Sequence, residues 1–164
     1  MKQDKKYILL LGGNVGDVKK TFAFAKSLLL KQGIEILQES SLYATEPWKM
    51  DGAEFLNQAI EVKTPLRANL LMSTLLEIEY QCGRDRTHIG KYTSRTLDID
   101  IVHAFDLIEN SEIVQIPHPR MHLRKFTLIP VSELTPHWQH PFLKKSCLEL
   151  LKECSDTSQV IKVA

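Results

Sequence analysis

The sequence predicts an α+β domain, a ferredoxin-like βαββαβ sandwich with helices packed on one side of an antiparallel sheet and with C-terminal additions. The expected elements follow the order strand, helix, strand, strand, helix, strand, which is the order of that fold. A chain of 164 residues is long enough to bury a core within one compact domain. Because no internal repeat, low-complexity tract or linker divides the chain, we expect a single domain over residues 1–164.

The first half of the chain has the patterns of a helix flanked by strands. The apolar segment KYILLL ends at two glycines and predicts a buried central strand. Residues 34–45 predict a second strand and residues 55–62 a third. Between the first and the second of these strands we expect a helix that begins at the cap Asp17 and ends at Gly33. Its apolar stripe consists of Val18, Phe22, Ala25, Leu28 and Leu29.

The second half begins with a helix that we expect to start at the cap Thr64, with Pro65 in its first turn, and to end at Gly83. A strand is predicted over residues 95–105 and a short strand over residues 113–119. The apolar stripe of the helix consists of Leu66, Leu70, Leu71, Leu75 and Ile78. The expected C-terminal additions are a helix over residues 120–134, a short helix over residues 146–156 and an edge strand over residues 159–163.

The composition argues against a general binder of nucleic acids or membrane surfaces, because basic and acidic residues nearly cancel to a formal charge of +1. No segment is long and apolar enough to span a bilayer, and the apolar run near the start is too short for an export signal. The three cysteines, Cys82, Cys147 and Cys154, lack metal-like spacing, so we expect reduced thiols. These patterns predict a cytoplasmic protein.

The stretch SRTLDIDIVHAF places two aspartates inside an apolar strand. Side chains two residues apart point the same way, so Asp98 and Asp100 share one face of that strand. Leu97, Ile99 and Ile101 share the other face and can enter the core. Two close carboxylates repel each other unless a positive charge lies between them, and Mg²⁺ prefers such oxygen ligands. The alternative is a solvated strand face whose acids pair with lysines.

Basic residues flank the aspartate pair on both sides in the sequence. Planar guanidinium groups suit phosphate oxygens. Phosphoryl transfer needs acidic residues that bind a metal and, beside them, arginines that bind an anion, because its catalysis is mostly positioning and charge neutralisation. The upstream group comprises Arg84, Arg86, Lys91 and Arg95, and the downstream group comprises Arg120, Arg124 and Lys125.

Together these motifs resemble the 6-hydroxymethyl-7,8-dihydropterin pyrophosphokinase family of folate biosynthesis, along nearly the whole chain. The matching stretches are YILLLGGN, YATEPW, FLNQAI, EIEYQCGRDR, SRTLDIDI and IPHPRMHLRKF. The resemblance implies an ATP-dependent diphosphokinase, which transfers a diphosphate from ATP to the hydroxymethyl group of a reduced pterin and releases AMP.

The resemblance also implies roles for particular residues. The paired aspartates would hold two Mg²⁺ ions, and Arg84 and Arg95 would act with Asp98 and Asp100 in catalysis. The ATP-binding residues would be Arg84, Lys91, Tyr92, Arg95, Ile101, His118 and Arg124. The pterin-binding residues would be Thr45, Pro47, Phe55, Asn57, Asp98 and Phe126, with the two phenylalanines on either side of the ring.

The strand pattern agrees with part of this assignment. Phe55 and Asn57 share one face of a strand, so one can stack on a flat ring while the other bonds its edge. The alternative for Phe55 and for Phe126 is packing in the core. The alternative for Asn57 is a hydrogen bond to nearby backbone.

The chain departs from the family pattern at four places. Tyr92, Thr93 and Ser94 stand where the family commonly has tryptophan followed by Gly-Pro, and the loss of the proline predicts a more flexible loop. The stretch Gly12-Gly13-Asn14 replaces the usual Gly-Ser-Asn. Pro119 stands where the family often has tyrosine, and Glu46 stands where it often has proline. None of the four departures removes a metal ligand or a phosphate arginine.

Two other classes of function stay open. A single-stranded RNA binder can share this sandwich, although no strand has the aromatic pattern of RNA-recognition modules. A metal-dependent nucleotidyl- or glycosyltransferase also uses acids to hold Mg²⁺ and a nucleotide. The stretch GGNVGD lacks the G-K-[S/T] ending of a phosphate loop. We expect small-molecule partners, ATP and a reduced pterin, with no nucleic acid or membrane, and a monomeric assembly.

Overall fold

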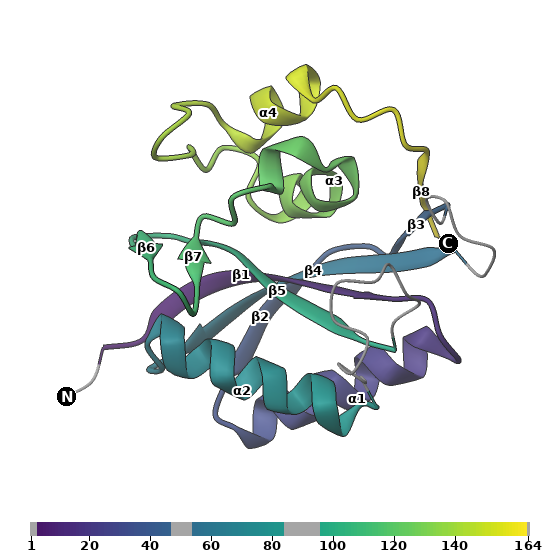
Figure 1. The fold of residues 1–164 in the computed structure, drawn as a ribbon, viewed down its shortest axis with the longest axis vertical. Helices are drawn as coiled ribbons and strands as arrows, with labels where there is room; N and C mark the ends of the chain where they lie inside the picture. Colours follow the sequence, from purple (N-terminus) through teal and green to yellow (C-terminus); the bar gives the residue numbers. More distant parts are fainter. Residues whose placement is uncertain (1–2, 47–53, 84–95, 164) are drawn as a thin grey trace.

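The computed structural model describes residues 3–46, 54–83 and 96–163, which fold into a central sheet with helices on both faces (Figure 1). Its elements in chain order are β1 (Lys5–Gly13), α1 (Val18–Lys31), β2 (Glu35–Glu39), β3 (Tyr43–Thr45), β4 (Phe55–Thr64), α2 (Ala68–Gln81), β5 (Asp98–Ala104), β6 (Glu109–Asn110), β7 (Gln115–Ile116), the 3₁₀ helix η1 (Met121–Leu123), α3 (Lys125–Leu134), α4 (Cys147–Glu153) and β8 (Val160–Lys162).

The main sheet has the strand order β5-β1-β4-β3-β8, with β2 also paired to β4, and all of its pairs are antiparallel. With β2 and β3 taken as one interrupted strand, this is the ferredoxin-like arrangement, and that prediction is confirmed. The interruption falls at Ser40, whose hydroxyl accepts the Ala59 N–H at 2.9 Å. A side chain therefore replaces the backbone partner there, and the predicted strand over residues 34–45 divides into two.

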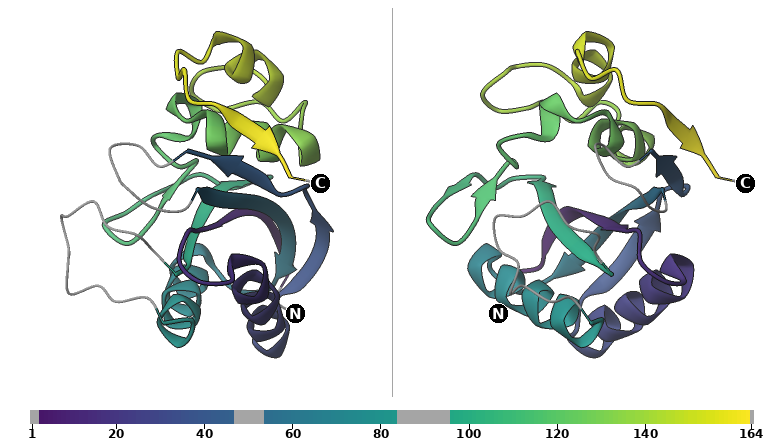
Figure 2. Two further views of the ribbon diagram at one scale, coloured as in Figure 1. Left: turned by 90° about the vertical axis from the view of Figure 1, so that its right-hand side faces the viewer. Right: turned by 45° about the vertical axis from the view of Figure 1, so that its right-hand side comes forward.

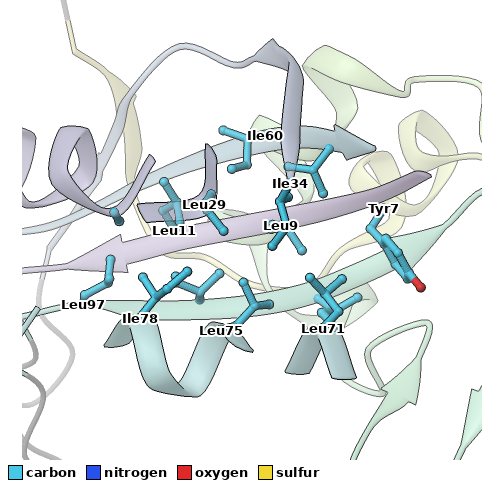
Figure 3. Close-up of a cluster of buried hydrophobic side chains, with 14 of the residues drawn as sticks. Tyr7, Leu9, Leu11, Leu29, Ile34, Ile60, Leu71, Leu75, Ile78 and Leu97 are labelled. Atoms are coloured by element: carbon cyan, nitrogen blue, oxygen red, sulfur yellow. The ribbon is translucent and has the colours of Figure 1, made fainter. Parts of the chain in front are cut away.

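The sheet separates two hydrophobic cores. Helices α1 and α2 cover one face and α3 and α4 cover the other (Figures 1 and 2). Strand β1 is buried from both sides, because its successive side chains alternate between the cores. The prediction of helices on one side therefore holds for α1 and α2, and the C-terminal helices close the opposite face. Figure 3 shows the first core, with Tyr7, Leu9, Leu11, Leu29, Ile34, Ile60, Leu71, Leu75, Ile78 and Leu97.

The observed first residues of α1 and α2 can be compared with the helix starts that the sequence predicts. Asp17 caps α1 as predicted, and its carboxylate accepts the Lys20 N–H at 3.2 Å. The predicted cap at Thr64 is wrong, because Thr64 pairs with Lys5 as the last residue of β4 and α2 begins only at Ala68. The Thr64 hydroxyl instead accepts the Leu66 N–H at 3.2 Å within a turn. Pairing with β1 therefore extends the strand past the local helix signal.

The C-terminal additions lie close to where the sequence places them. The predicted helix over residues 120–134 begins only at Lys125, after the short turn of η1. Helix α4 has a capping box between Ser146 and Glu149, and β8 is the predicted edge strand, paired with β3. Within the three described ranges, no helix combines the length and the apolar character that crossing a membrane requires.

Candidate active site at one end of the sheet

The antiparallel register brings the predicted site residues to one end of the sheet, here called the site end. It is formed by the last residues of β1 and β3 and the first residues of β4 and β5 (Figure 1). Gly12 of β1 lies opposite Asp98 on one side and Asn57 on the other. Asn57 in turn lies opposite Tyr43, and Phe55 lies opposite Thr45. Residues from four separate segments thus form one continuous surface.

The two aspartates lie on the face of the sheet that α3 and α4 cover. Leu97, Ile99 and Ile101 are at most 2% exposed in the core beneath α1 and α2, so the alternating side chains of Asp98 and Asp100 point the other way. Both aspartates are half-buried. This confirms the strand face that the two-residue period predicts.

A buried carboxylate on α2 holds the backbone between the two aspartates. Glu79 is 1% exposed, and its Oε2 accepts the Ile99 N–H at 2.8 Å. This hydrogen bond gives a partner both to a backbone N–H and to a buried side-chain oxygen. The start of β5, and with it the separation of the two acids, is therefore fixed to α2 as well as to β1.

The aspartate pair fits the ligand needs of Mg²⁺. Among the described residues, no three or more His, Cys, Asp or Glu side chains form a cluster that could hold a metal. Zinc sites need such a cluster, whereas Mg²⁺ commonly takes one or two carboxylates and completes its shell with water and substrate phosphates. Two half-buried acids on a rigid strand therefore suit Mg²⁺ bound together with a phosphorylated substrate.

His118 lies beside the aspartate strand as a neutral hydrogen-bond donor. Its backbone N–H bonds the Val102 carbonyl at 2.8 Å, which fixes the residue next to β5. Burial, together with the charges of Arg124 and Arg120, lowers the pKa of His118 to about 4, and the charge of Asp98 opposes this shift. Nδ1 accepts the Arg120 N–H at 3.1 Å, so the ring proton lies on Nε2. The imidazole can thus donate to an anion without carrying a charge.

The first turn of α3 presents an arginine and an aromatic ring to the same face. The Arg124 guanidinium carbon lies 5.7 Å from the centre of the Phe126 ring, which is within the range of a cation–π contact. Both side chains are half-buried, and Phe126 lines the edge of the second core, which lies between the sheet and the helices α3 and α4. Helix α3 packs against β4 and also contacts β1 and β3, so the helix lies over the face of the sheet that bears Phe55 and Asn57.

Two polar side chains of β3 and β4 lie at the site end of the sheet, next to Phe55. The Asn57 side chain is 6% exposed, and its Nδ2 donates to the Leu11 carbonyl at 3.3 Å. Thr45 is 7% exposed, and its hydroxyl has no hydrogen-bond partner among the described residues. A buried hydroxyl without a partner is costly, and a ligand that bonds it removes the cost. The site end therefore offers an amide and a hydroxyl to the edge of a bound molecule.

Several predicted site residues are not brought to this surface by the described structure. The Ile101 side chain is 2% exposed in the first core, on the face opposite the aspartates, so only its backbone could approach a nucleotide there. The remaining predicted residues lie outside the described ranges: Pro47, Arg84, Arg86, Lys91, Tyr92 and Arg95.

Sequence reasoning missed two residues that shape the site. Gly12 lies so close to Asn57 that an added Cβ would be 2.7 Å from Asn57 Nδ2. Glu79 is buried beneath the aspartate strand. No local pattern could reveal Gly12, because its importance depends on the register between β1 and β4. A glutamate on the buried stripe of α2 was a usable signal for Glu79, since a buried acid requires a partner.

An α+β sandwich with two acids on one strand face, and with His118 near both Asp98 and Arg124, has the groups that an enzyme of phosphoryl-transfer type uses. The family model described as 7,8-dihydro-6-hydroxymethylpterin-pyrophosphokinase (HPPK) matches residues 8–136, and the chain belongs to this family. The predicted family, its ATP-dependent pyrophosphokinase activity and its place in folate biosynthesis are thereby confirmed.

The chain is similar to single-activity and to fused relatives. It is 33% identical over 149 residues to a 2-amino-4-hydroxy-6-hydroxymethyldihydropteridine pyrophosphokinase of Synechocystis, covering 90% of this chain and 75% of the relative. It is 36% identical over 133 residues to a mitochondrial folate synthesis bifunctional protein of Pisum sativum, covering 80% of this chain but only 25% of that protein. The chain therefore spans about one quarter of the length of this fused relative.

A solved structure has the same fold at lower sequence identity. The crystal structure of wild-type Plasmodium falciparum HPPK-DHPS with STZ-DHP superposes with a TM-score of 0.68 and 14% identity. The alignment covers 93% of this chain and 42% of that one. This similarity supports the ferredoxin-like fold with its C-terminal additions.

Proposed function

We propose that this protein transfers a diphosphate from ATP to the hydroxymethyl group of 6-hydroxymethyl-7,8-dihydropterin, and that the site end of the sheet is where the transfer occurs. The main support is the shared surface on which Asp98, Gly12 and Asn57 are neighbours across three strands. In the reaction, the hydroxymethyl oxygen bonds the β-phosphorus of ATP, and the bond from that phosphorus to the oxygen shared with the α-phosphorus breaks. AMP leaves with that bridging oxygen, and the hydroxyl proton passes to solvent.

Asp98 and Asp100 would hold Mg²⁺ at the start of β5, and we propose two ions. Bound Mg²⁺ would neutralise phosphate charge and lower the pKa of the attacking hydroxyl. The contribution of the protein is a fixed pair of acceptors, because β5 is paired with β1 and its Ile99 N–H is bonded to Glu79. We place Asp98 also at the edge of the pterin, since Gly12 alone separates it from Asn57 in the sheet.

His118 and Arg124 would bind the ATP phosphates on the side of α3. A neutral Nε2–H donor adds a hydrogen bond to a phosphate oxygen, and the Arg124 guanidinium adds charge. We further propose that Arg84, Lys91, Tyr92, Arg95 and Ile101 complete the ATP site, with Arg84 and Arg95 acting on the charge that develops during transfer.

The pterin would lie between Phe55 and Phe126, with its edge bonded by Asn57 and by the Thr45 hydroxyl. The rings come from β4 and from the first turn of α3, two elements that pack against each other. A flat heterocycle gains stacking energy from aromatic faces, and its polar edge requires donors and acceptors at the wall of the slot. We also include Pro47 in this slot.

The direct test is incubation of the purified protein with ATP, Mg²⁺ and the reduced hydroxymethylpterin, followed by separation of the nucleotides. The proposal requires AMP and a pterin diphosphate in equal amounts. Free pyrophosphate or a nucleoside diphosphate would instead identify a nucleotidyl- or glycosyltransferase. Binding of short RNA in a gel shift, without AMP formation, would identify an RNA-binding module.

Three further properties belong to this proposal: a single domain over residues 1–164, a monomeric assembly and a cytoplasmic location. The cysteines support the last of these, since Cys82, Cys147 and Cys154 are all free thiols. Sedimentation of the purified protein tests the assembly.

A further inference from the structure

Helix α3, which bears Phe126 and follows Arg124, takes its cap from the far C-terminal segment. In the described part of the chain, the N-cap residue Arg124 makes no capping hydrogen bond with its own side chain. The Lys125 N–H instead donates to Asp156 Oδ2 at 2.9 Å, across 31 residues of sequence. A carboxylate at a helix N-terminus satisfies a backbone donor and also interacts favourably with the helix dipole. Lys125 lies between the two proposed site residues, so this bond holds the peptide that joins them.

The segment that bears Asp156 is itself fixed to the strand that bears Thr45. Asp156 Oδ1 accepts the Ser158 N–H at 2.8 Å, and β8 follows within two residues (Figure 2). In β8, Val160 lies opposite Thr45 in the antiparallel pair with β3. The segment therefore links the first turn of α3, which forms one wall of the proposed pterin slot, to β3, which bears Thr45 at the edge of that slot.

The other end of α3 is fixed to β3 as well. Glu133 accepts the Tyr43 hydroxyl at 2.7 Å and the Ser41 N–H at 2.6 Å. At the opposite end of the helix, the bond from Lys125 to Asp156 holds the first turn. Partial burial raises the pKa of Asp156, but the bonds from Ser158 and Lys125 and the Lys125 charge outweigh it and lower the pKa below its usual value. The carboxylate is therefore charged at neutral pH, as a strong acceptor requires.

We propose that Asp156 is a positioning residue, which sets the placement of Phe126 and Arg124 over the sheet by capping α3 from the C-terminal segment. The inference rests on the proposed function, because it assumes that Phe126 contacts the pterin. The family match ends at residue 136, so the residue lies beyond the part of the chain that the family model describes.

The test compares Asp156→Ala with Ser146→Ala in steady-state AMP formation, with the pterin varied at saturating ATP. Ser146→Ala is the matched control, because it removes the capping box of α4, a helix without a proposed site residue. We expect Asp156→Ala to raise the KM for the pterin about tenfold, with a smaller change in kcat, as loss of one helix cap would allow. Ser146→Ala should lower the melting temperature but leave that KM within about twofold of the wild-type value.

Two conservative variants separate positioning from folding. Asp156→Asn retains a good cap and should restore most of the pterin affinity. Asp156→Glu keeps the charge but moves the acceptor by one methylene, so it should raise the KM even if Asp156→Ala fails to fold. An unchanged KM in Asp156→Ala and Asp156→Glu, or an equal rise in Ser146→Ala, would overturn the positioning role while leaving the proposed function intact. Absence of AMP formation in the wild-type protein would overturn the proposed function, and this inference with it.

Discussion

Gly12 and Asn57 face each other across the β1–β4 ladder so closely that a Cβ on Gly12 would lie 2.7 Å from Asn57 Nδ2. The Asn57 amide is buried and donates to the Leu11 carbonyl at 3.3 Å. The absence of a side chain at residue 12 therefore leaves room for the amide in its present orientation. Because Asn57 is proposed to read the edge of the pterin, this backbone contact bears directly on substrate binding.

Gly12→Ala should displace the Asn57 amide and raise the KM for the pterin by about tenfold, which corresponds to roughly 1.4 kcal/mol of lost binding energy. Crowding of a packed site should also lower the free energy of unfolding by about 1–3 kcal/mol. Steady-state kinetics and urea unfolding measure the two effects. In an Asn57→Ala background the same substitution should have little further effect on the pterin KM, since the amide is already absent. Two fully additive effects would contradict the proposed contact.

Asp100→Asn should reduce AMP formation by about a thousandfold while leaving the fold intact, because it removes one charge from the proposed metal pair without changing the volume of the side chain. The rate of AMP formation and the urea midpoint measure activity and folding. Asp106→Asn is the matched control, since this aspartate is exposed beyond the end of the same strand. A rate for Asp100→Asn within tenfold of the control would refute the metal assignment.

Phe126→Leu should weaken pterin binding by about 1–3 kcal/mol, the usual value of one aromatic stack on a base-like ring. Leucine keeps most of the apolar volume at the edge of the second core, so the melting temperature should change little. Titration calorimetry with the pterin and a non-hydrolysable ATP analogue measures the affinity. The control is Phe142→Leu, at a side chain that is 66% exposed. Equal affinities for the two variants would place the pterin elsewhere, and Phe55→Leu tests the opposite wall in the same way.

The stability of the protein should fall as the pH is lowered below about 6.5. His103 is fully buried, stacks on Trp138 at 3.8 Å and bonds Thr135 through Nε2 at 3.0 Å. Burial lowers its pKa to about 3, although a backbone bond at Ala104 opposes the shift. The unfolded chain therefore takes up a proton below pH 6.5 that the folded chain does not bind. The stabilisation is complete above that pH and is lost progressively toward pH 3, by up to about 1.4 kcal/mol per pH unit.

Urea unfolding at several pH values between 7 and 4.5 measures this dependence. His103→Gln should be less stable at pH 7, because it loses the stack on Trp138, but its stability should fall less steeply with acidification. The difference in slope should approach one proton. His118 and His140, whose pKa values are also lowered by burial, should maintain part of the dependence in His103→Gln. Parallel pH profiles for wild type and His103→Gln would show that another group is responsible.

Local patterns in the sequence determined the order of the elements and the faces of the strands. The two-residue period placed Asp98 and Asp100 opposite the buried Ile99, and the cap at Asp17 marked the start of α1. These features depend on residues within one or two turns or strand steps of each other, so the sequence contains the information directly.

Only the tertiary structure decided the features that depend on register and on contacts between distant segments. Pairing with β1 carried β4 through Thr64, against the local signal for a helix start. The approach of Gly12 to Asn57 and the cap from Asp156 to Lys125 join residues 45 and 31 positions apart, respectively. Which distant groups meet is set by the packing of the whole sheet and its two cores, and a single sequence without that packing does not specify these pairs.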